Sequence, residues 1–346
     1  MGDRTVKVLV TGGAGYIGSS ICSALEDSGH TPVVLDSLVT GRPEFVRDRT
    51  FYAGDIADRA VLERIVHDHP DINHTIHCAA LIVVPESVSQ PYMYYRENVA
   101  KSLEMFKILG DLGLPNIVFS SSASIYDAVP SFRVDEDSPL KPSSPYARTK
   151  FMMEMVLRDM CAAHGLRGIA LRYFNPIGAD PQFRSGVHAR FPSHVLGKLV
   201  DTALGKQPSF DITGVDWPTR DGSGIRDFVH VWDLAMAHVK AIENFDSAFD
   251  IANAPGPRDD PNYLVINLGT GDGVTVKELV VAFERVYGKP VIVRDAPSRP
   301  GDVAGACANP DRARQLLGWT AERTIDEGIA SALEWGARRK AVLGYE

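Results

Sequence analysis

The sequence predicts an α/β protein: a doubly wound parallel sheet with a smaller C-terminal cap domain. Three observations support this prediction. Short β-rich runs alternate with amphipathic stretches through the first half of the chain. A glycine-rich turn directly follows the first of these runs. Beyond residue 178 the rhythm changes to long loops rich in Gly, Pro, Asp and Arg, which are typical of a ligand-facing cap.

The strands and helices can be assigned in order from hydrophobic periodicity. Six short runs are predicted to be strands: 6–10, 32–35, 50–52, 74–77, 117–120 and 169–172. Ile17, Ile21 and Leu25 recur every four residues and predict a helix that stops at Gly29. A second apolar face predicts a helix over 99–109. The last part of the chain returns to helix at 276–287, 310–317 and 325–338.

Composition and charge exclude several classes of protein. The 346 residues include 36 basic and 44 acidic side chains, and the net charge of −8 argues against nucleic-acid and membrane-surface partners. No apolar run approaches the roughly 18 residues that span a bilayer. The first predicted strand begins too early for a signal peptide, and four scattered cysteines are typical of reduced thiols in a cytoplasmic protein. We expect no metal site, because no Cys or Glu completes a ligand set beside the clustered histidines.

The glycine-rich turn lies between the first strand and the first helix and reads TGGAGYIG over residues 11–18. Glycines at this spacing let the backbone approach a pyrophosphate, which then meets the free N–H groups and positive dipole of the helix N-terminus. The strand before and the helix after make this signal stronger than a glycine pattern alone. We therefore predict a Rossmann-type dinucleotide-binding fold. Its phosphate loop comprises Gly12, Gly15, Tyr16, Ile17 and Gly18.

An acidic residue ends the second predicted strand. Asp36 lies 18 residues beyond Gly18, where a carboxylate accepts hydrogen bonds from the adenosine ribose and repels a 2′-phosphate. NAD is therefore favoured over NADP as the cofactor, although Arg42 nearby keeps NADP use open. Asp55 and Ile56 follow the third strand and are predicted to contact the adenine end.

A tyrosine and a lysine begin an amphipathic helix. The spacing of four puts Tyr146 and Lys150 on one helical face. An isolated tyrosine, with a pKa near 10, is a poor base at neutral pH. A lysine ammonium one turn away and a positive nicotinamide ring would stabilise its phenolate. A serine run over 120–124 ends a strand, where α/β sheets bind ligands, and a hydroxyl there can bridge the same substrate oxygen.

Together with Asn98 before its helix, these motifs resemble the extended short-chain dehydrogenase/reductase family. Within that family, the resemblance to the UDP-glucose (UDP-galactose) 4-epimerases spans nearly the whole chain. The segments that carry it are 8–18, 67–69, 119–126, 144–150, 172–176, 221–230 and 299–302. The resemblance implies an NAD-dependent UDP-hexose 4-epimerase that transiently oxidises the sugar at C4 to a 4-ketose. It also implies a UDP-sugar substrate and a homodimer built on helices within 99–109 and 151–160.

The resemblance implies a role for each matching residue. The catalytic residues would be Ser122, Tyr146 and Lys150. Asn98, Tyr146, Lys150 and Tyr173 would contact the cofactor. The implied substrate contacts are Ser122, Ser124, Tyr146, Asn175, Arg226, Arg299 and Asp302. Asn175 and the two arginines would meet the diphosphate and Asp302 the uridine ribose, although structural ion pairs are an alternative role for both arginines.

Three positions depart from the family pattern. Ile82 stands where a lysine is common near the nicotinamide carboxamide, and Asp127 stands where glycine is usual. Ala306 falls where bulkier side chains restrict the sugar pocket, so a larger substrate such as UDP-N-acetylglucosamine is an alternative. Arg184 and Arg190 in the cap could meet the carboxylate of UDP-glucuronate, or could be solvated loop arginines.

Two further alternatives are a nucleotide-sugar dehydratase and a non-catalytic NAD-binding protein. Dehydratases carry Asp or Glu just after the catalytic hydroxyl, where this chain has Ala123 and Ser124. A non-catalytic role fits poorly with an intact Ser, Tyr and Lys set.

We assign residues 1–178 to an NAD-binding Rossmann domain whose sheet is completed by parts of 225–250. Residues 179–346 form mainly a nucleotide-sugar-binding cap.

Overall fold

A computed structural model describes residues 5–254, 256, 258–298 and 302–345, and it confirms the α/β fold class. Seven strands form one sheet in the order β11-β7-β5-β4-β1-β2-β3, and every neighbouring pair is parallel. They are β1 (Lys7–Thr11), β2 (Thr31–Asp36), β3 (Thr50–Ala53), β4 (Ile72–His77), β5 (Asn116–Ser122), β7 (Arg167–Tyr173) and β11 (Tyr263–Leu268). The strand order reverses between β1 and β4, where doubly wound sheets bind their ligands.

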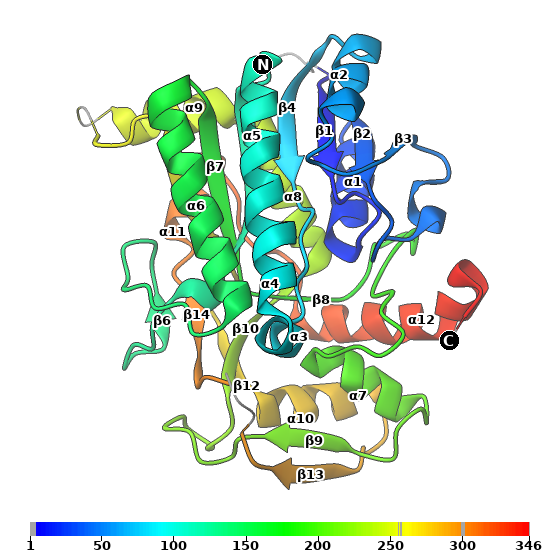
Figure 1. The fold of residues 1–346 in the computed structure, drawn as a ribbon. Helices are drawn as coiled ribbons and strands as arrows, with labels where there is room; N and C mark the ends of the chain where they lie inside the picture. The colour runs from blue at the N-terminus through cyan, green and yellow to red at the C-terminus, as the bar shows by residue number, and fades with distance from the viewer. Residues whose placement is uncertain (1–4, 255, 257, 299–301, 346) are drawn as a thin grey trace.

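Helices cover both faces of this sheet (Figure 1). One face carries α1 (Tyr16–Asp27), α8 (Val231–Glu243), α9 (Phe245–Asn253) and α11 (Asp311–Leu317). The other carries α2 (Arg59–Asp68), α5 (Lys101–Asp111) and α6 (Pro145–His164). Strand residues alternate between the two cores: Val8 and Val10 enter the first and Leu9 the second. Burial on both faces explains why the strands are nearly continuous apolar runs.

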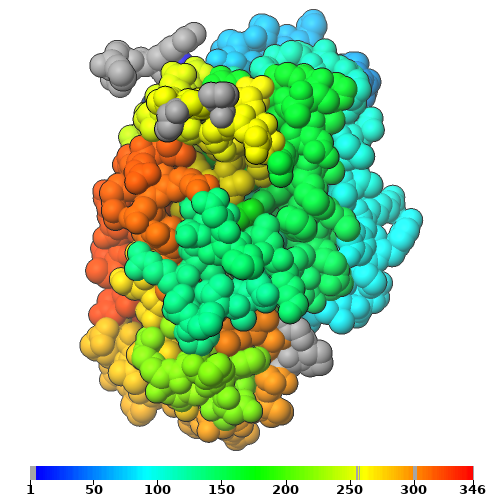
Figure 2. All heavy atoms as spheres, turned by 90° about the vertical axis from the view of Figure 1, so that its left-hand side faces the viewer, coloured from blue at the N-terminus to red at the C-terminus, as the bar shows by residue number. Residues whose placement is uncertain are grey.

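After β8 (Asn175–Ile177) the chain builds a smaller part with its own hydrophobic core. Its main sheet has the order β12-β10-β14-β6, with β8 paired beside β10. These strands are β6 (Arg133–Val134), β10 (Ile225–His230), β12 (Gly273–Thr275) and β14 (Gly305–Ala308). A two-stranded sheet of β9 (Phe210–Thr213) and β13 (Val293–Ala296) joins α7 (Val195–Ala203), α10 (Val276–Tyr287) and α12 (Ile325–Leu343). Figure 2 shows β9, α10 and β13 at the lower end of the molecule, below the large sheet.

Short helical segments complete the described elements. They are η1 (Pro43–Val46), α3 (Val84–Ser89), α4 (Pro91–Tyr94), the π-helical η2 (Tyr95–Ala100) and η3 (Ala123–Ile125). No helix in the described part of the chain is both long and apolar enough to cross a membrane.

The structure corrects one detail of the predicted sheet. The strand that completes it is β11, whereas we expected a segment within 225–250. That segment instead forms β10, which hydrogen-bonds to β8, β12 and β14 of the smaller sheet, and α8, which packs against α1. β11 suits the large sheet because its side chains are buried on both faces, with Leu264 in one core and Tyr263 in the other. The six predicted strands are all present, within two residues of the expected bounds.

Candidate active site

The phosphate loop follows β1 and opens α1, as predicted. Gly12 has φ +75°, and a Cβ at that position would lie 2.6 Å from the backbone nitrogen of Ala79. A Cβ on Gly18 would lie 2.1 Å from the carbonyl oxygen of Gly12. Only glycine therefore fits at either position. The N-cap of α1, Gly15, supplies no side-chain hydrogen bond, and the first turn carries no acidic residue. This cradle of open N–H groups fits the pyrophosphate of a dinucleotide.

Tyr16 and Ile17, the first two residues of α1, are part of this cradle. The hydroxyl of Tyr16 donates to the carbonyl oxygen of Gly178 at 2.7 Å. The phosphate loop is thereby tied to the turn that follows β8. Burial raises the pKa of the Tyr16 hydroxyl far above its ordinary value, so the group stays protonated as a donor.

Asp36 lies at the end of β2, beside the phosphate loop. Its two carboxylate oxygens accept hydrogen bonds from the backbone N–H of Ala14 at 3.0 Å and of Leu38 at 2.8 Å. Burial raises the pKa of Asp36, and these two hydrogen bonds partly offset that effect. Arg42 follows in the same loop, but its guanidinium carbon lies 4.9 Å from the centroid of the Tyr345 ring. The fixed carboxylate fits the ribose hydroxyls of NAD.

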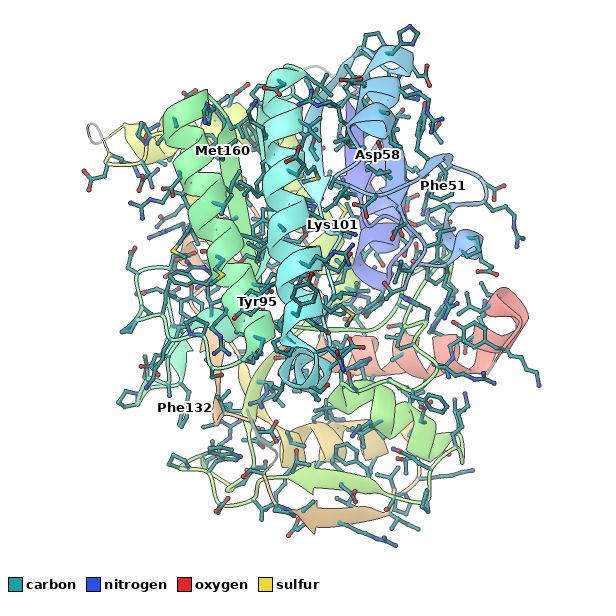
Figure 3. The ribbon with its side chains drawn as sticks, viewed as in Figure 1. Phe51, Asp58, Tyr95, Lys101, Phe132 and Met160 are labelled. Carbon is teal, nitrogen blue, oxygen red and sulfur yellow. The ribbon has the colours of Figure 1, made fainter. Side chains whose placement is uncertain are left out.

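Asp55 and Ile56 follow β3 at the same edge of the sheet. Asp55 is ion-paired with Lys101, which also contacts Glu97 one turn before it. Figure 3 labels Lys101 at the start of α5. Burial acts to raise the pKa of Asp55, but the hydrogen bond from Lys101 leaves it below its usual range. Ile56 is buried in the core beside α2. This pair therefore forms an anchored rim at the adenine end of the predicted cofactor site.

The Ser, Tyr and Lys side chains come from β5 and α6. Ser144 caps α6 by accepting the N–H of Ala147 at 3.1 Å, and Pro145 follows as the first helical residue. Tyr146 is therefore held in the first turn, and its buried hydroxyl lies near enough to Ser122, at the end of β5, for that side chain to lower its pKa. Ser122 donates to the hydroxyl of Ser124 at 2.9 Å. The three predicted hydroxyls thus lie close together.

Lys150 lies one turn after Tyr146 and is buried. Its ammonium donates to the carbonyl oxygen of Ser120 at 2.8 Å. Burial lowers the pKa of Lys150 to about 8, which leaves it mostly protonated at neutral pH. Burial raises the pKa of Tyr146, and the nearby Ser122 side chain partly offsets this. A phenolate at Tyr146 therefore needs positive charge nearby, and both Lys150 and an oxidised nicotinamide would supply it.

Next to this group, Ser120 makes a set of polar contacts that we did not predict from the sequence. The sulfur of Cys78 lies 3.0 Å from the hydroxyl of Ser120. Tyr173 lies near Ser120, which acts to lower its pKa, but burial raises that pKa well above its ordinary value. Ser120 thus contacts Cys78 and Lys150 and lies beside Tyr173. Its place in the serine run was visible in the sequence, but nothing there distinguished it from its neighbours.

Asn98 fixes the segment after β4. Its amide accepts from the backbone N–H of Leu81 at 2.8 Å and donates to the carbonyl oxygen of Leu81 at 2.9 Å. It also donates to Thr149 of α6 at 3.1 Å. Asn98 therefore shapes the chain beside Ile82, whose side chain is 62% exposed. We infer that any effect of Asn98 on the cofactor passes through this backbone.

The predicted substrate residues come from three segments of the cap. Asn175 on β8 pairs with Phe228 on β10. Arg226, also on β10, donates to the carbonyl oxygens of Ala304 at 3.0 Å and Val303 at 3.2 Å. It thereby holds the segment that contains Asp302. Arg299, which we also predicted, lies outside the described residues.

A buried carboxylate next to Arg226 ties these segments together. Asp227 accepts the N–H groups of Thr270, Gly271 and Ala308 at 2.8 to 3.0 Å. The Thr270 hydroxyl also donates to it at 2.7 Å. Burial raises the pKa of Asp227 even against these four bonds. The sequence motif included Asp227, but its role was not predicted because the partners lie more than 40 residues away.

The structure gives the contacts of the residues that depart from the family pattern and of the two cap arginines. Ala306 pairs with Arg226 across β14 and β10. The backbone N–H of Asp127 donates to the carbonyl oxygen of Pro139 at 2.8 Å, and its side chain accepts from the next residue. Arg184 binds Asp27 and Asp180 at 2.7 to 3.1 Å, whereas Arg190 is exposed. The described residues contain no group of three or more His, Cys, Asp and Glu side chains that could hold a metal ion.

Comparison with known proteins agrees with this geometry. The chain is 40% identical to UDP-glucose 4-epimerase of Bacillus subtilis, with 99% of each chain covered. The crystal structure of UDP-glucose 4-epimerase from Bifidobacterium longum in complex with NAD+ and UDP has a TM-score of 0.87 at 33% identity, covering 96% of this chain and 98% of that one. The UDP-Glc/GlcNAc 4-epimerase of Campylobacter jejuni has a TM-score of 0.79 at 31% identity, covering 96% and 99%.

Residues 8–254 match the NAD dependent epimerase/dehydratase family. This match confirms the resemblance to extended short-chain dehydrogenases/reductases, the Rossmann fold and the NAD cofactor expected from the sequence. With a glycine cradle, an acid at the end of β2 and a Ser, Tyr and Lys group at one edge of a parallel sheet, the chain belongs to the NAD dependent epimerase/dehydratase family.

Proposed function

We propose that this chain is an NAD-dependent UDP-hexose 4-epimerase that interconverts UDP-glucose and UDP-galactose. The observation that carries the proposal is that Ser122, Tyr146 and Lys150 come together at the edge of the sheet that bears the glycine cradle. Relatives named UDP-glucose 4-epimerase, 40% and 41% identical to nearly the whole chain, support the choice of reaction.

The cofactor would lie along the carboxyl ends of the strands. The residues proposed to hold it are Gly12, Gly15, Tyr16, Ile17, Gly18, Asp36, Asp55, Ile56, Asn98, Tyr146, Lys150 and Tyr173. The first five form the cradle for the pyrophosphate, and Asp36 accepts from the adenosine ribose. When bound, NAD supplies a reversible hydride acceptor for C4 of the sugar.

The chain's own residues then handle the proton. Tyr146 takes the proton of the sugar 4-hydroxyl, and the nearby Ser122 hydroxyl shares it by hydrogen-bonding to the same sugar oxygen. The Lys150 ammonium stabilises the phenolate that forms. The resulting 4-ketose stays held through its nucleotide. It rotates within the site and is then reduced on its other face.

The nucleotide would be held from the cap. We propose that Asn175, Arg226 and Arg299 contact the diphosphate and that Asp302 contacts the uridine ribose, with Ser124 beside the sugar. A guanidinium matches the geometry of phosphate oxygens and remains charged at any working pH. The carbonyl contacts of Arg226 keep it in the sheet that faces this site.

A second candidate substrate is UDP-N-acetylglucosamine. The methyl side chain of Ala306 beside Arg226 leaves room for a larger sugar, and one similar structure is a UDP-Glc/GlcNAc 4-epimerase. UDP-glucuronate is less well supported, because Arg184 already binds two carboxylates.

We also propose that the protein is a cytoplasmic homodimer. Leu103 on α5 and Met155 on α6 are 45% and 42% exposed, and exposed apolar side chains on adjacent helices are typical of a helix-to-helix interface. All four cysteines are free thiols, as expected in a reducing compartment. Sedimentation of the wild type and of Leu103→Glu tests the interface: we expect a dimer and a monomer respectively, and a monomeric wild type would contradict it.

The activity itself is tested with purified protein and three nucleotide-sugars. We expect UDP-galactose to be converted to UDP-glucose, with kcat/KM above the values for UDP-N-acetylglucosamine and UDP-glucuronate. A higher kcat/KM for UDP-N-acetylglucosamine would make that sugar the assigned substrate. Absence of any interconversion, with NAD present, would contradict the proposed reaction.

A further inference from the structure

The loop between β2 and β3 lies against the predicted adenosine site. A Cβ on Gly41 would lie 2.8 Å from a carboxylate oxygen of Asp36, so this loop lies directly against that acid. The backbone N–H of the next residue, Arg42, donates to the carbonyl oxygen of Ala14 in the phosphate loop at 2.8 Å. Movement of this loop would therefore disturb both the ribose-binding acid and the pyrophosphate cradle.

The residues after α12 hold this loop from outside. The guanidinium of Arg42 stacks on the ring of Tyr345 with 4.9 Å between guanidinium carbon and ring centroid. The Tyr345 hydroxyl donates to the carbonyl oxygen of His188 at 2.6 Å. Phe45 packs its ring against His188 and Trp335, at centroid distances of 5.7 and 6.0 Å. Figure 1 shows the end of α12 beside this loop.

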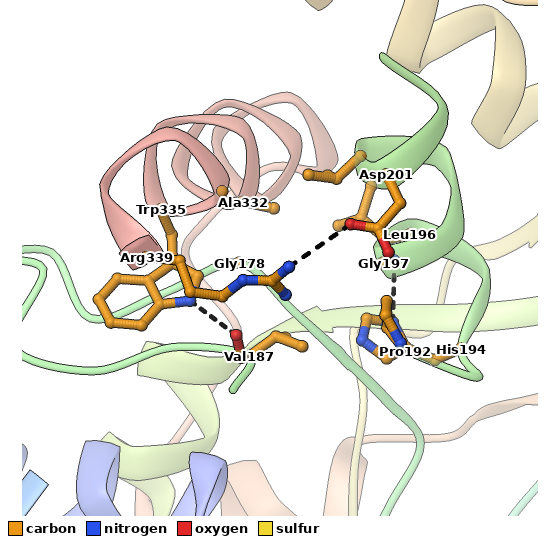
Figure 4. A pocket seen from close by; sticks show the side chains of 12 residues that line it. Gly178, Val187, Pro192, His194, Leu196, Gly197, Asp201, Ala332, Trp335 and Arg339 are labelled. Carbon is orange, nitrogen blue, oxygen red and sulfur yellow. Dashed lines mark hydrogen bonds and ion pairs between the residues drawn. The ribbon is translucent and has the colours of Figure 1, made fainter. Parts of the chain in front are cut away.

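α12 is itself anchored in the cap. The indole N–H of Trp335 donates to the carbonyl oxygen of Val187 at 2.8 Å (Figure 4). Arg339 donates to the carbonyl oxygen of Ala189 at 3.1 Å. Ile329 of the same helix is buried in the core of the cap. The helix thus joins the nucleotide-sugar side of the molecule to the adenosine loop.

Arg42 depends on this stacking for its position. Its Nε atom is buried and has no hydrogen-bond partner among the described residues. An arginine in this state is held by the aromatic face beneath it, and such contacts strengthen when desolvated. Loss of the Tyr345 ring would leave Arg42 without its stacking partner, while the ring contacts of Phe45 would remain.

We propose that Tyr345 is a positioning residue for the cofactor: it fixes Arg42 and the 37–46 loop against Asp36 and so slows the release of NAD. The inference rests on the proposed contact of Asp36 with the adenosine ribose. It assigns Tyr345 no contact with the reacting atoms.

The test is exchange of bound NAD in the holoenzyme against isotopically labelled NAD, followed by mass spectrometry. Tyr345→Ala should exchange NAD roughly three to ten times faster than the wild type, as loss of a partly buried cation–π contact implies. Tyr345→Phe keeps the ring and should restore most of the wild-type rate. Arg42→Ala should accelerate exchange to a similar degree, and the double variant no further, because both changes remove one contact.

The matched control is Arg285→Ala, which breaks an ion pair with Asp326 at the opposite end of α12. It should leave the exchange rate unchanged. Wild-type exchange in Tyr345→Ala would overturn the inference, as would equal acceleration in Arg285→Ala, which would indicate general loosening of the helix. A wild type that binds no NAD would instead contradict the proposed function.

Discussion

The catalytic edge of the large sheet and the substrate side of the cap are built in different ways. At the catalytic edge, short stretches of chain supply whole functional groups: residues 11–18 form the cradle, and Tyr146 and Lys150 lie one helical turn apart. On the cap side, Asn175, Arg226 and Ala306 come from three strands joined only by pairing in space.

The two regions are also stabilised differently. The catalytic edge lies between two apolar cores, and its polar groups bond to nearby backbone or to one another. The cap segments are joined by strand pairing and by a buried carboxylate, Asp227, which binds two other segments at once. We infer that the chemistry is encoded locally in the chain, whereas the choice of sugar depends on long-range packing.

The largest effect should come from the catalytic edge. Tyr146→Phe removes the proton acceptor and should lower kcat about 10²- to 10⁴-fold while NAD stays bound. Tyr95→Phe is the matched control, because Tyr95 accepts a hydrogen bond from Arg148 at 3.0 Å on the adjacent helix. Steady-state kinetics of both variants check this, and a Tyr146→Phe enzyme with near-normal kcat would contradict the assignment.

The cradle should be nearly as sensitive. Gly18→Ala brings a Cβ to 2.1 Å from a backbone oxygen, and relief of that overlap should weaken NAD binding about 10- to 100-fold. Gly110→Ala in α5 adds the same methyl 3.4 Å from Leu166, an ordinary contact, and should leave NAD binding unchanged. NAD titration of both variants distinguishes the outcomes. Equal affinities would mean that the loop does not hold the pyrophosphate.

On the cap side the effect should be on substrate binding and stability. Asp227→Asn points an amide N–H₂ at backbone donors, whichever way it is oriented, and should lower the free energy of unfolding by about 2–3 kcal/mol. KM for the UDP-sugar should rise while NAD affinity is preserved. Asp272→Asn, on the same loop but exposed, is the control. A loss of NAD affinity equal to the rise in KM would erase the distinction between the two regions.

The smallest effect concerns acid sensitivity. Burial lowers the pKa of His77, below the catalytic edge, to about 3, and that of His194 in the cap to about 4. Because the unfolded chain binds these protons near pH 6.5 and the folded chain does not, stability is lost as pH falls below 6.5. His77 accounts for about 2 kcal/mol of that loss by pH 5. The slope of the unfolding free energy against pH reports how many more protons the unfolded chain binds than the folded chain. His77→Gln should reduce this difference by about one proton and so make the slope shallower.

Denaturation by urea at several pH values measures this slope. His67→Gln, at an exposed position, is the matched control and should leave the slope as it is. An unchanged slope in His77→Gln would show that His77 is not buried in its neutral form.

How far each region could be predicted follows the same division. The strands, the glycine cradle and the Tyr146–Lys150 turn were predictable because their signals span a few residues. The strand β11 was missed, and so was the role of Ser120, whose neighbours Cys78, Lys150 and Tyr173 come from three other elements. The bonds of Asp227 join residues 43 and 81 positions apart, a separation that no local pattern reports.

The central claim is that the sugar is oxidised and reduced at C4 within one closed site. UDP-galactose labelled with deuterium at C4 tests it directly, with purified holoenzyme and no added NAD. We expect UDP-glucose that keeps the deuterium at C4, because the hydride leaves and returns without meeting water. Loss of the label to solvent, or no conversion at all, would contradict the account.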